Sequence, residues 1–371
     1  MAGGGPAPQI AVTGLAVLCA HGEGTGPLID AALTGRPAFT PVTRFDVTPH
    51  RARHAAHLPG TPRLAAELAR MIAQAAAHAG LDRELAAATA LLLALHSDRH
   101  TTATVAEVRD SVRRQVGLPA VTSTAVSACT ASSGALADAA VLLTAGRAPA
   151  AVVAAGYLVE PDTYALFDTA GALSRDGAVH PFSRGRRGPL LGDAVVAAVL
   201  ETTGSAQRRG ARPLALLAGW GRTGDAHHVC RPAPDGSGLA AAATAALSRA
   251  AVAPGQVGYV NANGTGSVLA DAAETRALHT VFGPGGGPPV SSTKSVHGHA
   301  LEASALLEFA VTVEALRAGR LPVNAGYLGT ADDCRLDLVL DSPRPARPRY
   351  ALSLNSAFGG ANTALLVEAA A

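Results

Sequence analysis

Short apolar runs recur along the chain and alternate with stretches that favour helices. Residues 10–18 are mostly apolar and bulky, as in a buried strand. Residues 64–79 and 104–116 are rich in strong helix formers. Further strand-like runs cover residues 89–95, 150–155, 195–201, 214–218 and 257–261. This alternation predicts an α/β fold whose strands pair mostly in parallel.

Two segments resemble each other, residues 129–136 and residues 299–306. Each opens a stretch of small residues that favours a helix, and these stretches end at Gly146 and Gly319. Because alanine-rich helices look alike, this resemblance is weak evidence for an internal duplication.

The composition narrows the class of protein. With 371 residues and 48% hydrophobic content, the chain can bury a large core. No apolar run reaches the roughly 18 residues that a membrane span needs, and the first residues lack a signal-peptide pattern, so we expect a cytoplasmic protein. A net charge of +2 and an aromatic content of 4% disfavour nucleic acid as a partner. Four cysteines without close spacing predict reduced thiols.

Cys129 is the candidate nucleophile. It stands where an extended segment gives way to a helix of very small residues, Thr130 to Gly134. A thiol at a helix N-terminus is close to unpaired backbone N–H groups, which predicts a lowered pKa and a reactive thiolate. The other cysteines lack this setting, and we expect them to be structural.

The single lysine of the chain, Lys294, lies in a second cluster with His297 and His299. His299 is at the start of a helix and is the better candidate for a base or hydrogen-bond donor, whereas we expect His297 to be structural. Two further glycine turns follow strand-like segments, at residues 260–267 and 353–362. Asp225 and the adjacent histidines lack metal-ligand spacing, so we expect no metal site.

Taken in order, these clusters resemble the β-ketoacyl synthases of fatty-acid and polyketide assembly over nearly the whole chain. The matching motifs are Val12-Thr-Gly-Leu15, Ser127-Ala-Cys-Thr-Ala-Ser132, His180-Pro-Phe182 with Arg187-Gly188 and Gly192-Asp193, Asp225-Ala-His-His228, Val260-Asn-Ala-Asn-Gly-Thr265, Ser292-Thr-Lys-Ser295 with Gly298-His299, Asp333-Cys-Arg-Leu-Asp-Leu-Val339, and Asn355-Ser356 with Phe358-Gly-Gly-Ala-Asn362.

The resemblance implies a five-layered αβαβα thiolase fold built from two similar halves, residues 1–204 with the nucleophile and residues 205–371. It also implies a dimer, as a homodimer or with another ketosynthase-like subunit. The acyl donor would be a phosphopantetheine thioester, on an acyl carrier protein or coenzyme A, with no permanently bound cofactor. Arg51 and Arg53 are candidate contacts for an acidic carrier protein.

The resemblance also assigns roles to single residues. Cys129 matches the acyl-accepting nucleophile and His299 the second active-site histidine. The backbone N–H groups of Cys129 and Phe358 match the oxyanion hole. Further matches are the hydroxyls that bind the pantetheine arm and a supporting charged pair; these residues are Thr265 with Ser267, and Lys294 with Glu308.

Asn263 departs from the pattern, because elongating enzymes of this branch have a histidine there. An asparagine amide can donate a hydrogen bond to an enolate oxygen, but it cannot exchange protons. Three functions therefore stay open: a condensing enzyme, an acyltransferase that passes the chain to another thiol, amine or hydroxyl, and a silent partner subunit like a chain-length factor. Retention of Cys129, Lys294 and His299 counts against the third.

Overall fold

A computed structural model describes residues 9–98, 100–285 and 287–370. Its strands in the first part of the chain lie in the order β6-β5-β7-β8-β1. Their bounds are β1 Ile10–Cys19, β5 Ala90–Leu95, β6 Val121–Ala125, β7 Ala150–Tyr157 and β8 Ala194–Thr202. All of them are mostly apolar and buried except the edge strand β6, which is polar at its centre and partly exposed.

The second part of the chain repeats this arrangement. Its strands lie in the order β11-β10-β14-β15-β9, which is again third, second, fourth, fifth and first in chain order. Their bounds are β9 Ala215–Gly224, β10 Val257–Asn261, β11 Val290–Ser291, β14 Tyr350–Ser356 and β15 Ala361–Ala369. Strands β1 and β9 pair with each other, so the two halves share one continuous sheet.

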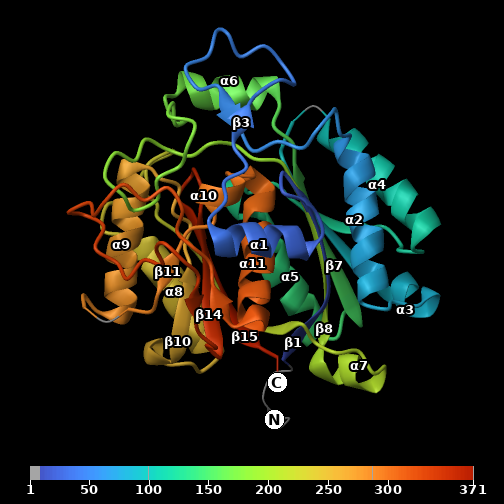
Figure 1. Ribbon diagram of the computed structural model, residues 1–371. Coiled ribbons are helices and arrows are strands. Elements are labelled where there is room, and N and C mark those ends of the chain that lie inside the picture. Colours follow the sequence, from blue (N-terminus) through green and yellow to red (C-terminus); the bar gives the residue numbers. More distant parts are fainter. Residues whose placement is uncertain (1–8, 99, 286, 371) are drawn as a thin grey trace.

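Helices form three layers, one outside each half of the sheet and one between the two halves (Figure 1). Helices α2 (Leu64–His78) and α4 (Thr101–Gln115) pack outside the first half, and α8 (Ser237–Arg249) with α9 (Val268–Phe282) outside the second. Helices α5 (Ala131–Thr144) and α11 (Ser304–Ala318) lie between the halves and contact strands of both. The order of layers is therefore αβαβα, as the resemblance implied.

Shorter elements complete the described chain. The helices are α1 Thr25–Thr34, α3 Arg83–Ala88, α6 Pro161–Thr169, α7 Thr203–Arg208 and α10 Lys294–His297, with the 3₁₀ turns η1 Ala128–Thr130, η2 Pro254–Gln256 and η3 Leu301–Ala303. The strands are β2 Gly22–Glu23, β3 Thr40–Pro41, β4 His54–Ala55, β12 Arg320–Leu321 and β13 Arg344–Pro345. The division expected at residue 204 falls inside α7, and a separation into two domains there stays a prediction.

The expectation of mostly parallel pairing is wrong. Strand β5 pairs in parallel with β6 and β7, and β10 with β11 and β14. The other large pairings, β1 with β8 and β9, β7 with β8, and β15 with β14 and β9, are antiparallel. The apolar pattern could not distinguish these cases, because a strand buried on both faces is apolar throughout in either direction.

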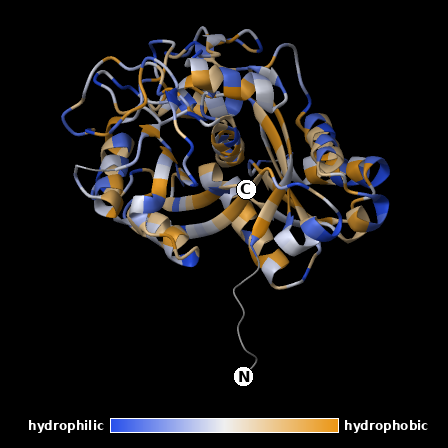
Figure 2. Ribbon diagram, turned by 60° about the horizontal axis from the view of Figure 1, so that its bottom comes forward, coloured by the Kyte–Doolittle hydropathy of each residue, from blue (hydrophilic) through white to orange (hydrophobic). Residues whose placement is uncertain are grey.

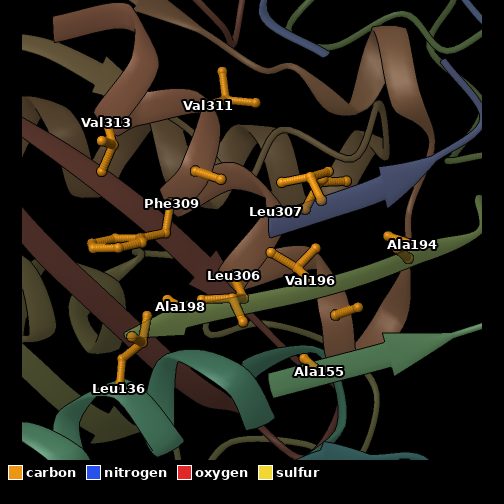
Figure 3. Close-up of a cluster of buried hydrophobic side chains, with 14 of the residues drawn as sticks. Leu136, Ala155, Ala194, Val196, Ala198, Leu306, Leu307, Phe309, Val311 and Val313 are labelled. Carbon is orange, nitrogen blue, oxygen red and sulfur yellow. The ribbon is translucent and has the colours of Figure 1, made fainter. Parts of the chain in front are cut away.

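The core is centred on α11, which is buried from Ser304 to Leu316. A helix enclosed between two sheets has no solvent-facing side and needs apolar or small residues all round. Figure 3 shows Leu306 and Phe309 of α11 with Leu136 of α5 and Val196 of β8 in one cluster. In Figure 2 the central strands are mainly hydrophobic, whereas the helices at the sides carry both kinds of residue.

None of the helices in the described ranges is long and apolar enough to cross a membrane.

The middle layer should carry a large share of the stability. Leu306 is fully buried there, so Leu306→Ala should lower the free energy of unfolding by about 2–5 kcal/mol, through lost burial and the cavity left behind. Urea unfolding followed by circular dichroism measures this change. Leu166→Ala is the control, because Leu166 is 66% exposed. Equal, small effects of both substitutions would contradict this account of the core.

Candidate active site

Cys129 lies at the centre of η1, between strand β6 and helix α5. Ala128, immediately before it, has a φ of 47°, a left-handed conformation that is strained for a residue with a side chain. This sharp turn places the cysteine at the buried start of the middle layer, where it is 7% exposed.

His299 faces the thiol directly. Its Nε2 atom is 3.1 Å from Cys129 Sγ, and its Nδ1 atom is 2.8 Å from Ser304 Oγ. The backbone N–H of His299 donates to Leu190 O, which fixes the residue beside the loop that precedes β8. When Nδ1–H donates to Ser304, the lone pair of Nε2 can accept the thiol proton, which is the arrangement of a nucleophile and its base.

The resting pair is uncharged. Burial raises the pKa of Cys129 to about 12, with Glu302 acting in the same direction and the charge of Lys294 opposing it. Burial, followed by the charge of Lys294, holds the pKa of His299 well below its ordinary range. The sequence-based expectation of a lowered thiol pKa is therefore wrong, because loss of hydration outweighs the helix N-terminus. Removal of the thiol proton therefore requires a base within reach, and His299 Nε2 is the ring nitrogen that contacts the thiol.

Lys294, Glu308 and Asn263 form a second group. The side chains of Lys294 and Glu308 are fully buried, and Nζ lies 2.7 Å from Glu308 Oε1. Nζ also donates to Asn263 Oδ1 at 3.3 Å, and Asn355 Nδ2 donates to Glu308 Oε2 at 2.6 Å. The buried ammonium thus has a carboxylate partner, as charge burial requires.

The loop that carries Asn263 is held from α9. The two carboxylate oxygens of Glu274 accept the backbone N–H groups of Asn263 and Gly264, each at 2.8 Å. Gly264 has a φ of 26°, and a Cβ atom there would lie 2.4 Å from Ser292 Cβ. Glycine is therefore required for the close approach of this loop to the segment before Lys294.

The remaining residues that the sequence singled out lie farther out. Thr265 and Ser267 are half-buried at the outer end of the Asn263 loop, beside exposed residues at the start of α9. Phe358, in the turn between β14 and β15, is 52% exposed and stacks on Phe167 with ring centroids 5.7 Å apart. Both strands pack against η1, so this turn lies on the Cys129 side of the sheet.

His297 is structural. It is fully buried, and its ring nitrogens contact Thr293 Oγ1 and Gly298 O rather than Cys129. Burial lowers its pKa to about 3, so it stays neutral. Asp225 binds Asn362 Nδ2 and the N–H of Ala233. Within the described ranges, no group of three or more potential ligands is placed to hold a metal ion.

Sequence reasoning assigned no role to three contributors to the site. Ser304 orients His299, Asn355 binds Glu308, and Glu302 forms an ion pair with His96 at 2.8 Å. Ser304 and Glu302 stand close to His299 in the sequence, and this proximity was the available signal. His96 is 206 positions from Glu302, so no local pattern could connect them.

Comparison with known proteins shows which family has this sequence and fold. A family model for the N-terminal domain of β-ketoacyl synthases matches residues 110–206, and one for the C-terminal domain matches residues 214–327. Nodulation protein E of Rhizobium meliloti is 37% identical over 243 residues, which are 64% of this chain and 59% of that protein. The 3-oxoacyl-[acyl-carrier-protein] synthase 2 of Staphylococcus aureus is 33% identical over 251 residues, 66% of this chain and 62% of that protein.

The chain thus spans about three fifths of the length of the curated relatives it matches. The solved structure of the ishigamide ketosynthase/chain length factor superimposes with a TM-score of 0.89 and 25% identity, covering 98% of this chain and 100% of the other. The two family matches together cover more than half of the sequence. The chain belongs to the β-ketoacyl synthase family and has its thiolase fold.

Proposed function

We propose that this protein is an acyltransferase of the 3-oxoacyl synthase type, which takes an acyl group onto Cys129 and transfers it to a malonyl-derived carbanion. The observation that carries the proposal is the 3.1 Å contact between Cys129 Sγ and His299 Nε2 at the buried start of α5. The donor is a phosphopantetheine thioester, on an acyl carrier protein or coenzyme A.

The first half-reaction is transthioesterification. His299 Nε2 accepts the proton of Cys129, and the thiolate attacks the acyl carbonyl carbon to form a C–S bond. The backbone N–H groups of Cys129 and Phe358 would hold the oxyanion. When the tetrahedral species collapses, the bond to the pantetheine sulfur breaks, and His299 returns the proton to that leaving thiolate. Thr265 and Ser267 would bind the pantetheine arm as it enters.

The second half-reaction makes the new carbon–carbon bond. The malonyl thioester loses carbon dioxide, and the electrons of the broken bond form an enolate. The Asn263 amide would donate a hydrogen bond to the enolate oxygen. His299 would donate a second one from Nε2–H in its other neutral tautomer, in which the Ser304 hydroxyl donates to Nδ1. The carbanion attacks the acyl carbonyl, the C–S bond to Cys129 breaks, and a proton from water restores the thiol. Lys294 and Glu308 act as supporting groups, since Lys294 orients the Asn263 amide by binding its oxygen.

Asn263 supports a second candidate function. An amide cannot exchange protons as an imidazole does, so the site could load Cys129 without driving decarboxylation. The protein would then be a non-elongating acyltransferase that passes the chain to a thiol, amine or hydroxyl. The reading as a chain-length-factor-like subunit is disfavoured by the intact Cys129 and His299 pair.

Two surface features suit protein partners, a second subunit and a carrier protein. Strand β6 ends the sheet, with one edge paired to β5, and exposed Val126 follows it. An unpaired strand edge of this kind suits pairing with a second subunit. The two arginines expected to contact a carrier protein, Arg51 and Arg53, are both exposed and stay the candidates. Arg51 also donates to the main chain of Asp168 and Thr169, which holds its guanidinium at the surface beside α6. We place the enzyme in the cytoplasm, where its thiols stay reduced.

The acyl group should attach to Cys129. Intact-mass analysis after incubation with an acyl thioester should show one adduct, and peptide mapping should place it on Cys129. Cys129→Ser should abolish rapid loading, whereas Cys230→Ser, at an exposed thiol, should not. His299→Ala should slow loading by about 10²–10⁴-fold, because the buried thiol then lacks its base. An adduct on Cys230 or Cys334 would overturn the assignment.

Asn263→His separates the two candidate functions. If the protein is non-elongating, the wild type should load Cys129 yet release little carbon dioxide from malonyl thioester. Losing an oxyanion donor costs about 10²–10³ in rate, and the histidine should recover part of this deficit. Radiolabelled carbon dioxide release measures it, with acyl loading as the control for folding. Fast release by the wild type that slows in Asn263→His would identify the asparagine as the working donor of a condensing enzyme.

A further inference from the structure

Glu302 occupies in η3 the position that Cys129 occupies in η1. Each is the central residue of a 3₁₀ turn that leads into one of the two middle-layer helices. Each follows a residue in the left-handed region, Leu301 at a φ of 42° and Ala128 at 47°. The two turns pack against each other. The sequence comparison had aligned Cys129 with His299. The two turns instead place Cys129 and the carboxylate residue Glu302 at equivalent positions of the internal duplication.

The carboxylate of Glu302 is buried and half satisfied. The residue is 3% exposed, and its Oε1 atom accepts from His96 Nδ1 at 2.8 Å. Its Oε2 atom is buried and has no hydrogen-bond partner among the residues that the structure describes. A purely structural contact between η3 and the end of β5 would explain why Oε1 binds His96, but it would not explain why Oε2 is buried without a partner. A buried acceptor that lacks a partner is costly, so its retention needs another explanation.

Two polar side chains, His96 and Tyr157, lie near this carboxylate at the ends of apolar strands. Turn η3 packs against β5, β7 and η1. His96 follows β5 directly, and its side chain is 36% exposed. Tyr157, at the end of β7, is buried, and burial together with Glu160 and Glu302 keeps its pKa well above the ordinary range, so its hydroxyl stays protonated. Glu302 is also close enough to influence the Cys129 thiol electrostatically.

We propose that Glu302, with His96, forms a subsite for the acyl part of the substrate and selects chains that carry a hydrogen-bond donor, a hydroxyl or amino group, over plain alkyl chains. The donor would pair with the free Oε2 atom of Glu302. An alkyl chain would leave that acceptor unpaired, and this difference is the source of the selectivity. The inference rests on the proposed function, because it requires an acyl group on Cys129.

The test is a panel of pantetheine thioesters that differ at one position. Each donor-bearing chain has an alkyl match in which a methyl group replaces the hydroxyl or amino group. The pairs are 3-hydroxybutanoyl with 3-methylbutanoyl, 3-aminopropanoyl with butanoyl, and 6-hydroxyhexanoyl with heptanoyl. The initial rate of Cys129 loading is followed by intact mass. At least one donor-bearing chain should load about 10-fold or more faster than its alkyl match. The hydroxyl and amino members distinguish a neutral donor from a cationic one.

Glu302→Gln sharpens the test, because a glutamine can still accept from His96 while it presents an N–H₂ donor in place of Oε2. The preference for donor-bearing chains should disappear. The 3-oxobutanoyl thioester, which offers an acceptor, should load Cys129 faster than it does in the wild type. Glu314→Gln is the matched control, since Glu314 is a buried carboxylate on α11 that binds Arg317. This control should keep the wild-type preference.

The failures are distinguishable. Equal loading of all chains by the wild type, with no change in Glu302→Gln, would overturn the subsite and leave the proposed acyl transfer standing. No loading of Cys129 by any thioester would overturn the proposed function and the subsite with it. The wild-type panel requires no substitution, so a poorly folding variant does not decide the outcome.

Discussion

Two helices enclosed between the halves of one sheet fix the relative position of the candidate nucleophile and its base. Because α5 and α11 both begin in the interior, their first turns η1 and η3 meet, and the residues on those turns face a space that neither half could form alone. Cys129 comes from the first turn and His299 from the segment just before the second. The fold thus brings together two groups 170 positions apart by packing alone.

Burial then decides the charges. Removing Cys129 and His299 from water favours their neutral forms, and the fully buried Lys294 further disfavours an imidazolium nearby. Lys294 itself keeps a partner in Glu308, whose second oxygen is satisfied by Asn355. Beside the compensated Lys294–Glu308 ion pair, the site therefore holds an uncharged nucleophile–base pair. Such a pair becomes reactive only when an electrophile accepts electrons from the sulfur.

The sequence predicted those parts of the molecule that depend on local pattern. Apolar runs located strands such as β1 and β7 to within two residues of their ends, and the setting of Cys129 and His299 singled out both. It could not predict strand direction, because doubly buried strands look alike. It also gave the wrong direction for the Cys129 pKa, since burial arises from distant segments. The His96–Glu302 pair was missed for the same reason: its partners meet through the packing of η3 on β5.

Asn263 shows how a substitution can fit a site and still change its chemistry. Its oxygen accepts from Lys294, and Glu274 holds its backbone from the opposite side, so the amide orientation is fixed by charge and by the loop together. With the oxygen committed to an ammonium, the amide nitrogen is the end that can donate to a substrate oxygen. Unlike an imidazole, this donor does not titrate. Of Asn263 and His299, only His299 can therefore exchange a proton.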